Sequence, residues 1–536
     1  MFPALAAAFF AIAILIRRVQ YKSLRFLRGP PSPSFLLGNN YEIENQEDGT
    51  LVEDKWFKEY GTAFRYTGIL GLEKLMVADA KALQYILHTS GYRFPKSRDS
   101  RELALRFLGK GIIWAEGQVH QRQRKAMNPA FSASQLKQFL NLFQVSVDKA
   151  NKWGQMLQDK KSGDTLDVAQ WLPRATLDVI GESAFDFKFD ALDNKSSELS
   201  DAMKHVADDS RDPSQLLILF RTWRRRLALP DFVLELIDSL PITKEDFRLE
   251  HFLKTSKKVG KELLESKGED AAARDEKDIL SVLVRSNRTE DLKKRMDEDE
   301  VLSQIATLIL AGHETTAYTI CWILYELAMR PEQQERIVEE LAEIRLRNST
   351  DYLTAQEYDS MPFFNAVIKE GLRLHPVVAR LNRVAGQDDV IPLAESVKST
   401  SGDYMSHIPV QKGQNVTIDV FRYNRLTSVW GEDASEWNPS RFLNRDLKDQ
   451  LSLGVYSNVV TFSGGVRGCI GWRFAVMEMQ AFLAGILQNF EFAVPPGLDL
   501  VTCPTVNFAA GPMLRDNKDK GIHLPLVVRA RAKPTV

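Results

Sequence analysis

The chain has 536 residues, 44% of them hydrophobic and 26% charged, and is long enough to bury a large core. Its 70 Lys and Arg residues nearly balance 71 Asp and Glu residues, whereas a nucleic-acid-binding protein would be expected to carry a basic excess. Three cysteines exclude both a disulfide framework and a Cys/His metal cluster. No Gly/Ser-rich or acidic linker follows the first forty residues, so we expect one large, mainly helical body.

The N-terminus is predicted to anchor the protein in a membrane. An uncharged apolar run from Phe2 to Ile16 would reach about 22 Å as a helix, short of a bilayer core of about 30 Å. Basic residues follow the run at once, whereas a cleaved secretion signal carries its charge first. This placement predicts a single-pass anchor with its basic flank in residues 1–28 and a cytosolic body. A stiff proline-rich hinge in residues 29–40 and the body in 41–536 would follow.

The stretch from Ser214 to Phe232 mixes apolar residues with a basic cluster. This composition fits an entrance that dips into a membrane, and it fits an amphipathic packing helix equally well.

A helix of some thirty residues is predicted from about Asp299 to Met329, because the segment is apolar and free of proline until Pro331. At about 1.5 Å per residue it would be about 45 Å long and could cross the whole molecule. Its middle carries Ala311-Gly312-His313-Glu314-Thr315-Thr316, a poor choice for a core helix because hydroxyls compete for backbone carbonyls. Either the polar residues have a function, or Glu314 forms a surface pair and Thr315 bonds back to residue 311.

Two further segments carry charges at suggestive spacings. Glu370 and Arg373 lie three apart on one face of a helix that should end at His375-Pro376. Later in the chain, Arg441 lies within the run Trp437-Asn438-Pro439-Ser440-Arg441-Phe442. By itself, an acid three residues before an arginine is common and has little meaning.

The run from Phe462 to Gly471 is the most informative part of the chain. Four glycines surround Cys469, which would let the backbone approach a flat group and donate N–H groups to the sulfur. Arg467, two residues before the cysteine, favours an apolar cofactor that carries carboxylates. A lone cysteine is ordinarily a small buried hydrophobic residue, and we expect that role for Cys321 and Cys503.

The pattern F-x-x-G-x-R-x-C-x-G resembles the haem-binding loop of the cytochromes P450, the haem-thiolate monooxygenases. The segment from Ala311 to Thr316 is similar to that family's oxygen-activating helix, A-G-x-[DE]-T-T. The family pattern E-x-x-R followed by W-x-P-x-R-F is also present in the right order. The resemblance extends from about Pro30 to the C-terminus and implies the cytochrome P450 fold, a large helical domain with a long central helix and a small β-rich region.

The resemblance also implies roles for individual residues. Cys469 would ligate the iron of haem b. Gly312 would let O2 and substrate approach, Thr315 would hold an ordered water and Glu314 would feed protons. Glu370, Arg373 and Arg441 would form a structural network. The cofactor would be bound by His120, where tryptophan is more usual but imidazole can also donate, and by Arg124, Arg383, Phe462, Arg467 and Gly471. The substrate pocket would include Ile113, Leu310, Val377 and Val378.

The implied reaction inserts one atom of O2 into a lipophilic small molecule and releases the other as water. The style of the chain is similar to fungal members that modify terpenoids or other secondary metabolites. Electrons would come from NADPH through a separate membrane flavoprotein reductase, with cytochrome b5 as a further candidate, at the endoplasmic reticulum membrane. Arg122, Lys125 and Arg473 would form a basic patch for an acidic partner, or are ordinary solvated charges.

Two other functions retain Cys469. A haem-thiolate isomerase or dehydratase, or a non-catalytic haem-binding sensor, would not need the acid and threonine of the central helix. The presence of Glu314 and Thr315 therefore favours the monooxygenase.

Overall fold

The computed structural model describes residues 24–151, 165–193, 198–199, 201–202, 244–267, 278–287, 295–347, 352–443, 452–503 and 509–531. Most of the predicted anchor (residues 1–23) and the stretch from Ser214 to Phe232 lie outside these ranges. Within them, no helix combines the length and the apolar character needed to cross a bilayer. Leu24 and Leu27 are fully buried, and Leu27 forms a β-bridge with Ser399. The folded body therefore includes residues before the predicted boundary at 41.

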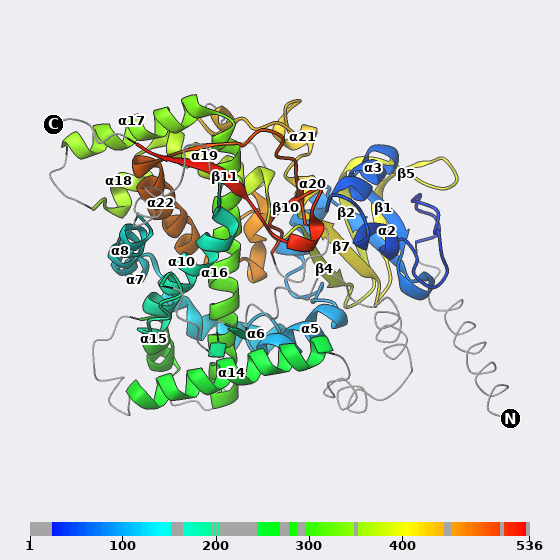
Figure 1. The fold of residues 1–536 in the computed structure, drawn as a ribbon. Coiled ribbons are helices and arrows are strands. Elements are labelled where there is room, and N and C mark those ends of the chain that lie inside the picture. Colours follow the sequence, from blue (N-terminus) through cyan, green and yellow to red (C-terminus); the bar gives the residue numbers. More distant parts are fainter. Residues whose placement is uncertain are drawn as a thin grey trace.

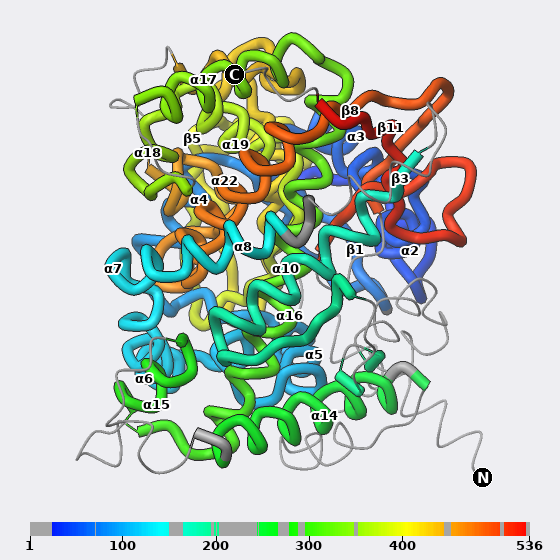
Figure 2. The backbone as a smooth tube through the Cα atoms, turned by 60° about the vertical axis from the view of Figure 1, so that its left-hand side comes forward, coloured from blue at the N-terminus to red at the C-terminus, as the bar shows by residue number. Residues whose placement is uncertain are grey.

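One long helix, α16 (Glu298–Ala328), crosses the body and organises the other helices around it (Figure 1). Asp297 and Glu300 start it with a reciprocal capping box, and it ends shortly before Pro331. Its bounds confirm the predicted helix to within one residue at each end. Both views place α10 (Val168–Phe185) alongside α16 (Figure 2). The Oγ1 of Thr176 in α10 donates to the carbonyl of His313 at 3.0 Å, which joins the two helices at the polar segment.

A four-stranded sheet lies at one side of the helical body (Figure 1), in the order β1-β2-β7-β4. Strand β2 (Glu73–Val77) pairs with β7 (Asn415–Asp419) in parallel, and the two outer pairings are antiparallel. Strand β4 (Arg380–Val384) carries Arg383, which pairs with Val416 of β7. The sheet thus holds this cation on a rigid element. Together with the helices, it confirms the predicted fold of a large helical domain with a small β-rich region.

The remaining elements complete the helical body and the smaller sheets. The other helices are α2 (Asn40–Glu44), α3 (Leu51–Tyr60), α4 (Ala80–Gln84), α5 (Arg98–Leu108), α6 (Gly117–Met127), α7 (Ala133–Leu136), α8 (Leu140–Asn151), α14 (Lys244–Lys267), α15 (Ile279–Ser286), α17 (Pro331–Arg347), α18 (Ala355–Asp359), α19 (Pro362–Leu374), α20 (Val420–Tyr423), α21 (Thr427–Trp430) and α22 (Trp472–Asn489). The other strands are β1 (Ala63–Thr67), β3 (Thr165–Asp167), β5 (Asp389–Lys398), β6 (Tyr404–Val410), β8 (Phe490–Ala493), β9 (Leu500–Thr502), β10 (Pro512–Leu514) and β11 (Pro525–Ala530).

Candidate active site

The cysteine loop leads directly into α22. The N–H of Cys469 donates to the carbonyl of Phe462 at 2.8 Å, which closes the loop, and its side chain is exposed. Burial nevertheless raises the pKa of the Cys469 thiol, whereas the N–H of Gly471 and the charge of Arg124 act in the opposite direction. These two groups would stabilise a thiolate at this position. Cys321 is buried, as expected of a packing residue.

The loop glycines at positions 464 and 465 have a different role from the one predicted. A side chain at Gly465, whose φ is +62°, would approach the carbonyl oxygen of Leu87 to 1.8 Å. At Gly464 it would approach the carbonyl oxygen of Leu453 to 2.2 Å. The absent side chains therefore let the loop pack against other protein segments, not against a flat ligand. One of these segments is a π-helical turn, Tyr85–Thr89.

Helix α6 contributes two of the predicted cofactor-binding residues. His120 and Arg124 are four apart and so lie on the same helix face. The Nη1 of Arg124 donates to the carbonyl of Gly468 at 2.5 Å, which brings α6 to the cysteine loop. The Nδ1 of buried His120 is 2.7 Å from the hydroxyl of Tyr92, and no described residue hydrogen-bonds its Nε2. Burial lowers the pKa of His120 to about 4, so the imidazole is neutral at pH 7.

Arg383 and Arg467 differ in how far their charges are compensated. The Nε of Arg467 donates to Glu116 at 3.1 and 3.2 Å, and its Nη2 forms a close ion pair with the same carboxylate. Among the described residues, the guanidinium of buried Arg383 donates only to the carbonyl of Asn382 at 3.0 Å, and no carboxylate lies within ion-pair distance. Burial and the neighbouring Arg467 lower the pKa of Arg383 to about 10. Arg383 thus retains donors for an anionic group, whereas Arg467 already has a carboxylate partner.

Sequence reasoning missed three residues around these cations. Glu116 precedes α6 and accepts from the backbone N–H of Lys96 at 3.0 Å as well as from Arg467. The Nζ of Lys96 donates to the carbonyls of Ile112, Ile113 and Ala115 at 3.1, 2.6 and 2.9 Å. Burial lowers the pKa of Lys96 to about 7, although Glu116 opposes this shift. Tyr92 lies under Arg467, with the guanidinium carbon 4.6 Å from its ring centroid. Only the acid just before the helix start offered a sequence signal.

The polar segment of α16 lies in an otherwise largely buried helix. Ala311 is exposed, and Gly312, Glu314 and Thr315 are half-buried. The Oγ1 of Thr315 donates to the carbonyl of Ala311 at 2.8 Å, the back-bonding that the sequence left open. A side chain at Gly312 would approach Cδ1 of Ile180 to 2.7 Å, so this glycine permits α10 to pack against α16. Its predicted role in admitting O2 stays a prediction.

The two ionisable residues of this segment have opposite pKa shifts. Burial raises the pKa of Glu314 to about 7, so both protonation states are available near neutral pH. Burial lowers the pKa of His313 to about 4, and its Nδ1 is 2.7 Å from the carbonyl of Ile309. Its Nε2 lies 3.9 Å from Glu314 but carries no charge at pH 7. Among the described residues no charged cation pairs with Glu314, which disfavours the alternative of a structural ion pair.

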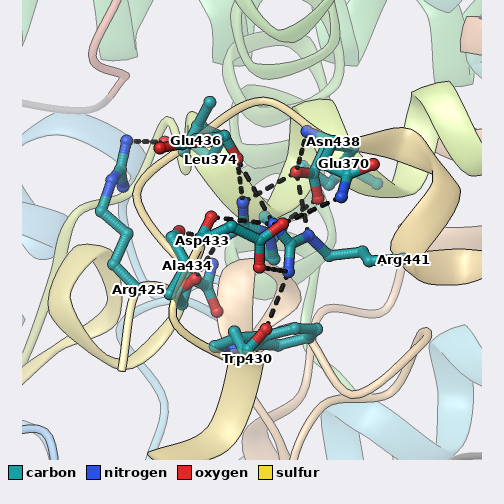
Figure 3. A network of polar contacts seen from close by, with 12 residues as sticks. Glu370, Leu374, Arg425, Trp430, Asp433, Ala434, Glu436, Asn438 and Arg441 are labelled. Carbon is teal, nitrogen blue, oxygen red and sulfur yellow. Dashed lines mark hydrogen bonds and ion pairs between the residues drawn. The ribbon is translucent and has the colours of Figure 1, made fainter. Parts of the chain in front are cut away.

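The three residues of the predicted structural network contact one another and are buried (Figure 3). Glu370 is fully buried and accepts from Arg373 at 2.7 and 2.8 Å and from Arg441 at 3.1 Å. Arg373 also donates to the carbonyls of Asn424, Ala434 and Glu436. Arg441 reaches the carbonyl of Trp430 and the carboxylate of Asp433. The network ties α19 to the segment that follows α21, so these charges hold the fold.

The predicted pocket residues are apolar and differ in burial. Leu310 and Val377 are buried, and Ile113 and Val378 are half-buried. The carbonyl of Val377 accepts from the N–H of Ala510 at 2.7 Å, which brings in a segment that sequence reasoning did not select. Their place in one substrate pocket stays a prediction.

The predicted basic patch loses one member. Arg122 forms a two-pronged ion pair with Glu300 at 2.6 and 2.7 Å and donates to the carbonyl of Arg295. It therefore holds α6 against the start of α16 and is not a free surface charge. Lys125 and Arg473 are exposed.

The residues around Cys469 fit a haem. The sulfur is exposed beside a backbone N–H and a cation, as a thiolate ligand requires. Arg383 and neutral His120 offer uncommitted donors suited to carboxylates. Exposed Ala311 shows that the polar part of α16 is accessible, as oxygen chemistry would need.

Comparison with known proteins agrees with this site. The model of the family "Cytochrome P450" matches residues 28–512. Cytochrome P450 monooxygenase 205 of Postia placenta is 33% identical over 549 residues, covering 98% of this chain and 96% of that protein. Cytochrome P450 monooxygenase claQ of Ampulloclitocybe clavipes is 33% identical over 477 residues, covering 88% and 87%. The chain belongs to the cytochrome P450 family and is a haem-thiolate monooxygenase.

Proposed function

We propose that the protein oxidises a lipophilic small molecule, a terpenoid or a related secondary metabolite, with electrons from NADPH delivered by a membrane flavoprotein reductase. The apolar residues Ile113, Leu310, Val377 and Val378 support an uncharged substrate, because an ionic one would lose its hydration without gaining a partner. The relatives named as monooxygenases support an oxidation, and the substrate class rests on the similarity of the chain to family members that modify terpenoids or other secondary metabolites. Cytochrome b5 is a further candidate donor, and the endoplasmic reticulum membrane is the proposed location.

The single observation that carries the reaction type is the accessible acid and alcohol in α16. When bound, haem with a thiolate ligand supplies the activation of O2, as is established for this family. Glu314, with a pKa of about 7, can accept a proton from solvent and release it near neutral pH. The Thr315 hydroxyl now donates to Ala311, and rotation would let it hold a water instead. These residues give the chain a means of proton delivery that an isomerase or a sensor would not need.

The first experiment establishes the ligand and the reaction type. The reduced carbon-monoxide difference spectrum should show the thiolate band in the wild type and lose it in Cys469→Ser. Membranes that contain the protein, a reductase and NADPH should then convert members of a terpenoid panel. Conversion without NADPH and O2 would identify an isomerase or dehydratase, and a thiolate band without conversion or NADPH consumption with any panel member would favour a sensor.

The second experiment tests the proton-delivery role. Thr315→Ala should retain haem but release more hydrogen peroxide and form less product per NADPH. Thr315→Ser keeps the hydroxyl and serves as the matched control. An unchanged product yield in Thr315→Ala would contradict the role of this hydroxyl.

A further inference from the structure

Tyr92 connects two residues, predicted from the sequence to bind the cofactor, that lie far apart in the chain. Its hydroxyl is 2.7 Å from Nδ1 of His120, and its ring lies under the guanidinium of Arg467 at 4.6 Å. The rings of Tyr92 and His120 meet edge to face, with centroids 5.7 Å apart. The hydroxyl therefore contacts one nitrogen of an imidazole whose other nitrogen has no partner among the described residues.

The protonation state of His120 decides which of its nitrogens can donate a hydrogen bond, and the contact with Tyr92 can influence this. The imidazole is neutral, because burial and the nearby Lys96 and Arg467 disfavour a further positive charge. A neutral imidazole carries one proton, on either Nδ1 or Nε2, and only the protonated nitrogen can donate. Binding a carboxylate through Nε2 requires the proton to be on Nε2.

The acid–base character of the two groups favours one direction for the hydrogen bond. Burial and Glu116 raise the pKa of Tyr92 against the opposing cations Arg467 and Arg124, so the phenol remains protonated and can donate. An unprotonated imidazole nitrogen is a stronger acceptor than a phenol oxygen. The hydroxyl is therefore better suited to donate to Nδ1 than to accept from it.

We propose that Tyr92 is a positioning residue for the cofactor: its hydroxyl donates to Nδ1 of His120 and so places the imidazole proton on Nε2, where it can donate to a haem carboxylate. This inference rests on the haem binding of the family. It gives His120 the donor that the indole N–H provides without help in relatives with tryptophan there. The exchange of tryptophan for histidine thus makes the chain dependent on a second residue.

The test measures the rate at which haem transfers from the holoprotein to excess apomyoglobin. Tyr92→Phe removes only the hydroxyl and should accelerate haem loss about tenfold, the lower end for loss of an outer hydrogen-bond partner. In a His120→Trp background, the same Tyr92→Phe change should alter the rate by less than about twofold, because an indole has its donor in one fixed position. Tyr66→Phe removes another buried hydroxyl contact, 3.0 Å from Thr417 in the sheet, and should leave haem loss unchanged.

Two results would overturn the role of Tyr92. One is equal haem loss in Tyr92→Phe and the wild type. The other is the same acceleration in both backgrounds, which would indicate a packing role. If His120→Trp does not yield holoprotein, His120→Asn provides an amide N–H without a tautomer choice and replaces it. A wild-type protein without bound haem would instead contradict the haem-dependent function itself. Failure of that function can therefore be distinguished from failure of the role of Tyr92.

Discussion

Two groups of buried arginines in this protein differ in how completely their donors are used. Arg373 donates from all three of its nitrogens, to Glu370 and to three backbone carbonyls. Arg383 is also buried, yet its guanidinium makes one hydrogen bond to the described residues, to the carbonyl of Asn382. Hydrogen bonds and a carboxylate within the chain offset the cost of burying the charge of Arg373. The charge of Arg383 is largely uncompensated by the described residues. A saturated cation marks a structural network, and an unsaturated one indicates a place where a ligand supplies the missing charge.

The largest effect is expected from breaking the saturated network. Glu370→Gln leaves Arg373 and Arg441 buried without a full counter-charge, so the free energy of unfolding should fall by about 3 to 5 kcal/mol. Urea unfolding followed by circular dichroism measures this change. Glu335→Gln is the control, because its ion pair with Arg531 is half exposed and should contribute less than about 1 kcal/mol. Equal effects of the two substitutions would contradict the distinction.

For Arg383, whose donors are mostly unused, a substitution should affect haem binding and not stability. Arg383→Leu should weaken haem binding by about 10- to 100-fold, since a charge-assisted hydrogen bond contributes about 1.5 to 3 kcal/mol. The haem-free chain should be as stable as before, because the lost charge has no acidic partner among the described residues. Haem titration and urea unfolding of the haem-free protein separate the two effects. Arg529→Leu, on the exposed end of β11, is the control. Loss of stability without weaker haem binding would assign Arg383 to the structural group.

Glu314, a half-buried acid without a charged partner among the described residues, should make the free energy of unfolding depend on pH. Glu314 keeps its proton in the folded state up to about pH 7, whereas the unfolded carboxyl ionises near its ordinary value of 4.5. Glu314 therefore binds more protons in the folded state in this window, and its own contribution to stability should fall by about 1 to 3 kcal/mol as pH rises from 4.5 to 7. In Glu314→Gln this part of the pH dependence should disappear. His313, whose folded pKa is about 4 against 6.5 when unfolded, contributes the opposite slope below about pH 6.5, and it does so in both proteins, so it cancels in the comparison. Identical profiles for variant and wild type would show that Glu314 is ionised when folded.

The smallest effect is expected at the exposed cations. Lys125→Glu with Arg473→Glu should slow reduction by the reductase and weaken its salt dependence, since both charges are solvated. Activity supported by a surrogate peroxide should not change. Stopped-flow reduction measures the first and product formation the second. Equal loss of both activities would indicate damage to the fold in place of weaker docking.

Local patterns were sufficient where one element carries the whole signal. The central helix and its end before Pro331 were predicted from the apolar pattern and the proline, and the pairing of Glu370 with Arg373 was predicted from the family resemblance. The cysteine loop was recognised from one run of residues. Its glycines were interpreted less well, because their neighbours, Leu87 and Leu453, belong to segments that spacing cannot place beside them.

The partners of the charged residues were beyond prediction for the same reason. Arg122 was assigned to the surface and instead pairs with Glu300, 178 positions away. Arg467 was assigned to the cofactor, and 351 positions separate it from its carboxylate partner Glu116. Contacts over such distances depend on how helices and loops pack together, which periodicity and motif spacing do not describe.

By itself, the sequence determined the reaction type, because the cysteine loop and the acid and alcohol of the central helix are short motifs that can be recognised as similar to those of the cytochromes P450 without knowing the fold. Only the tertiary structure decided which of the buried charges are available to a ligand. Availability depends on whether a partner from elsewhere in the chain already uses each donor. For this reason Arg467 and Arg383, which the resemblance assigned alike to the cofactor, differ in the folded chain: Glu116 pairs with Arg467, and no described carboxylate pairs with Arg383.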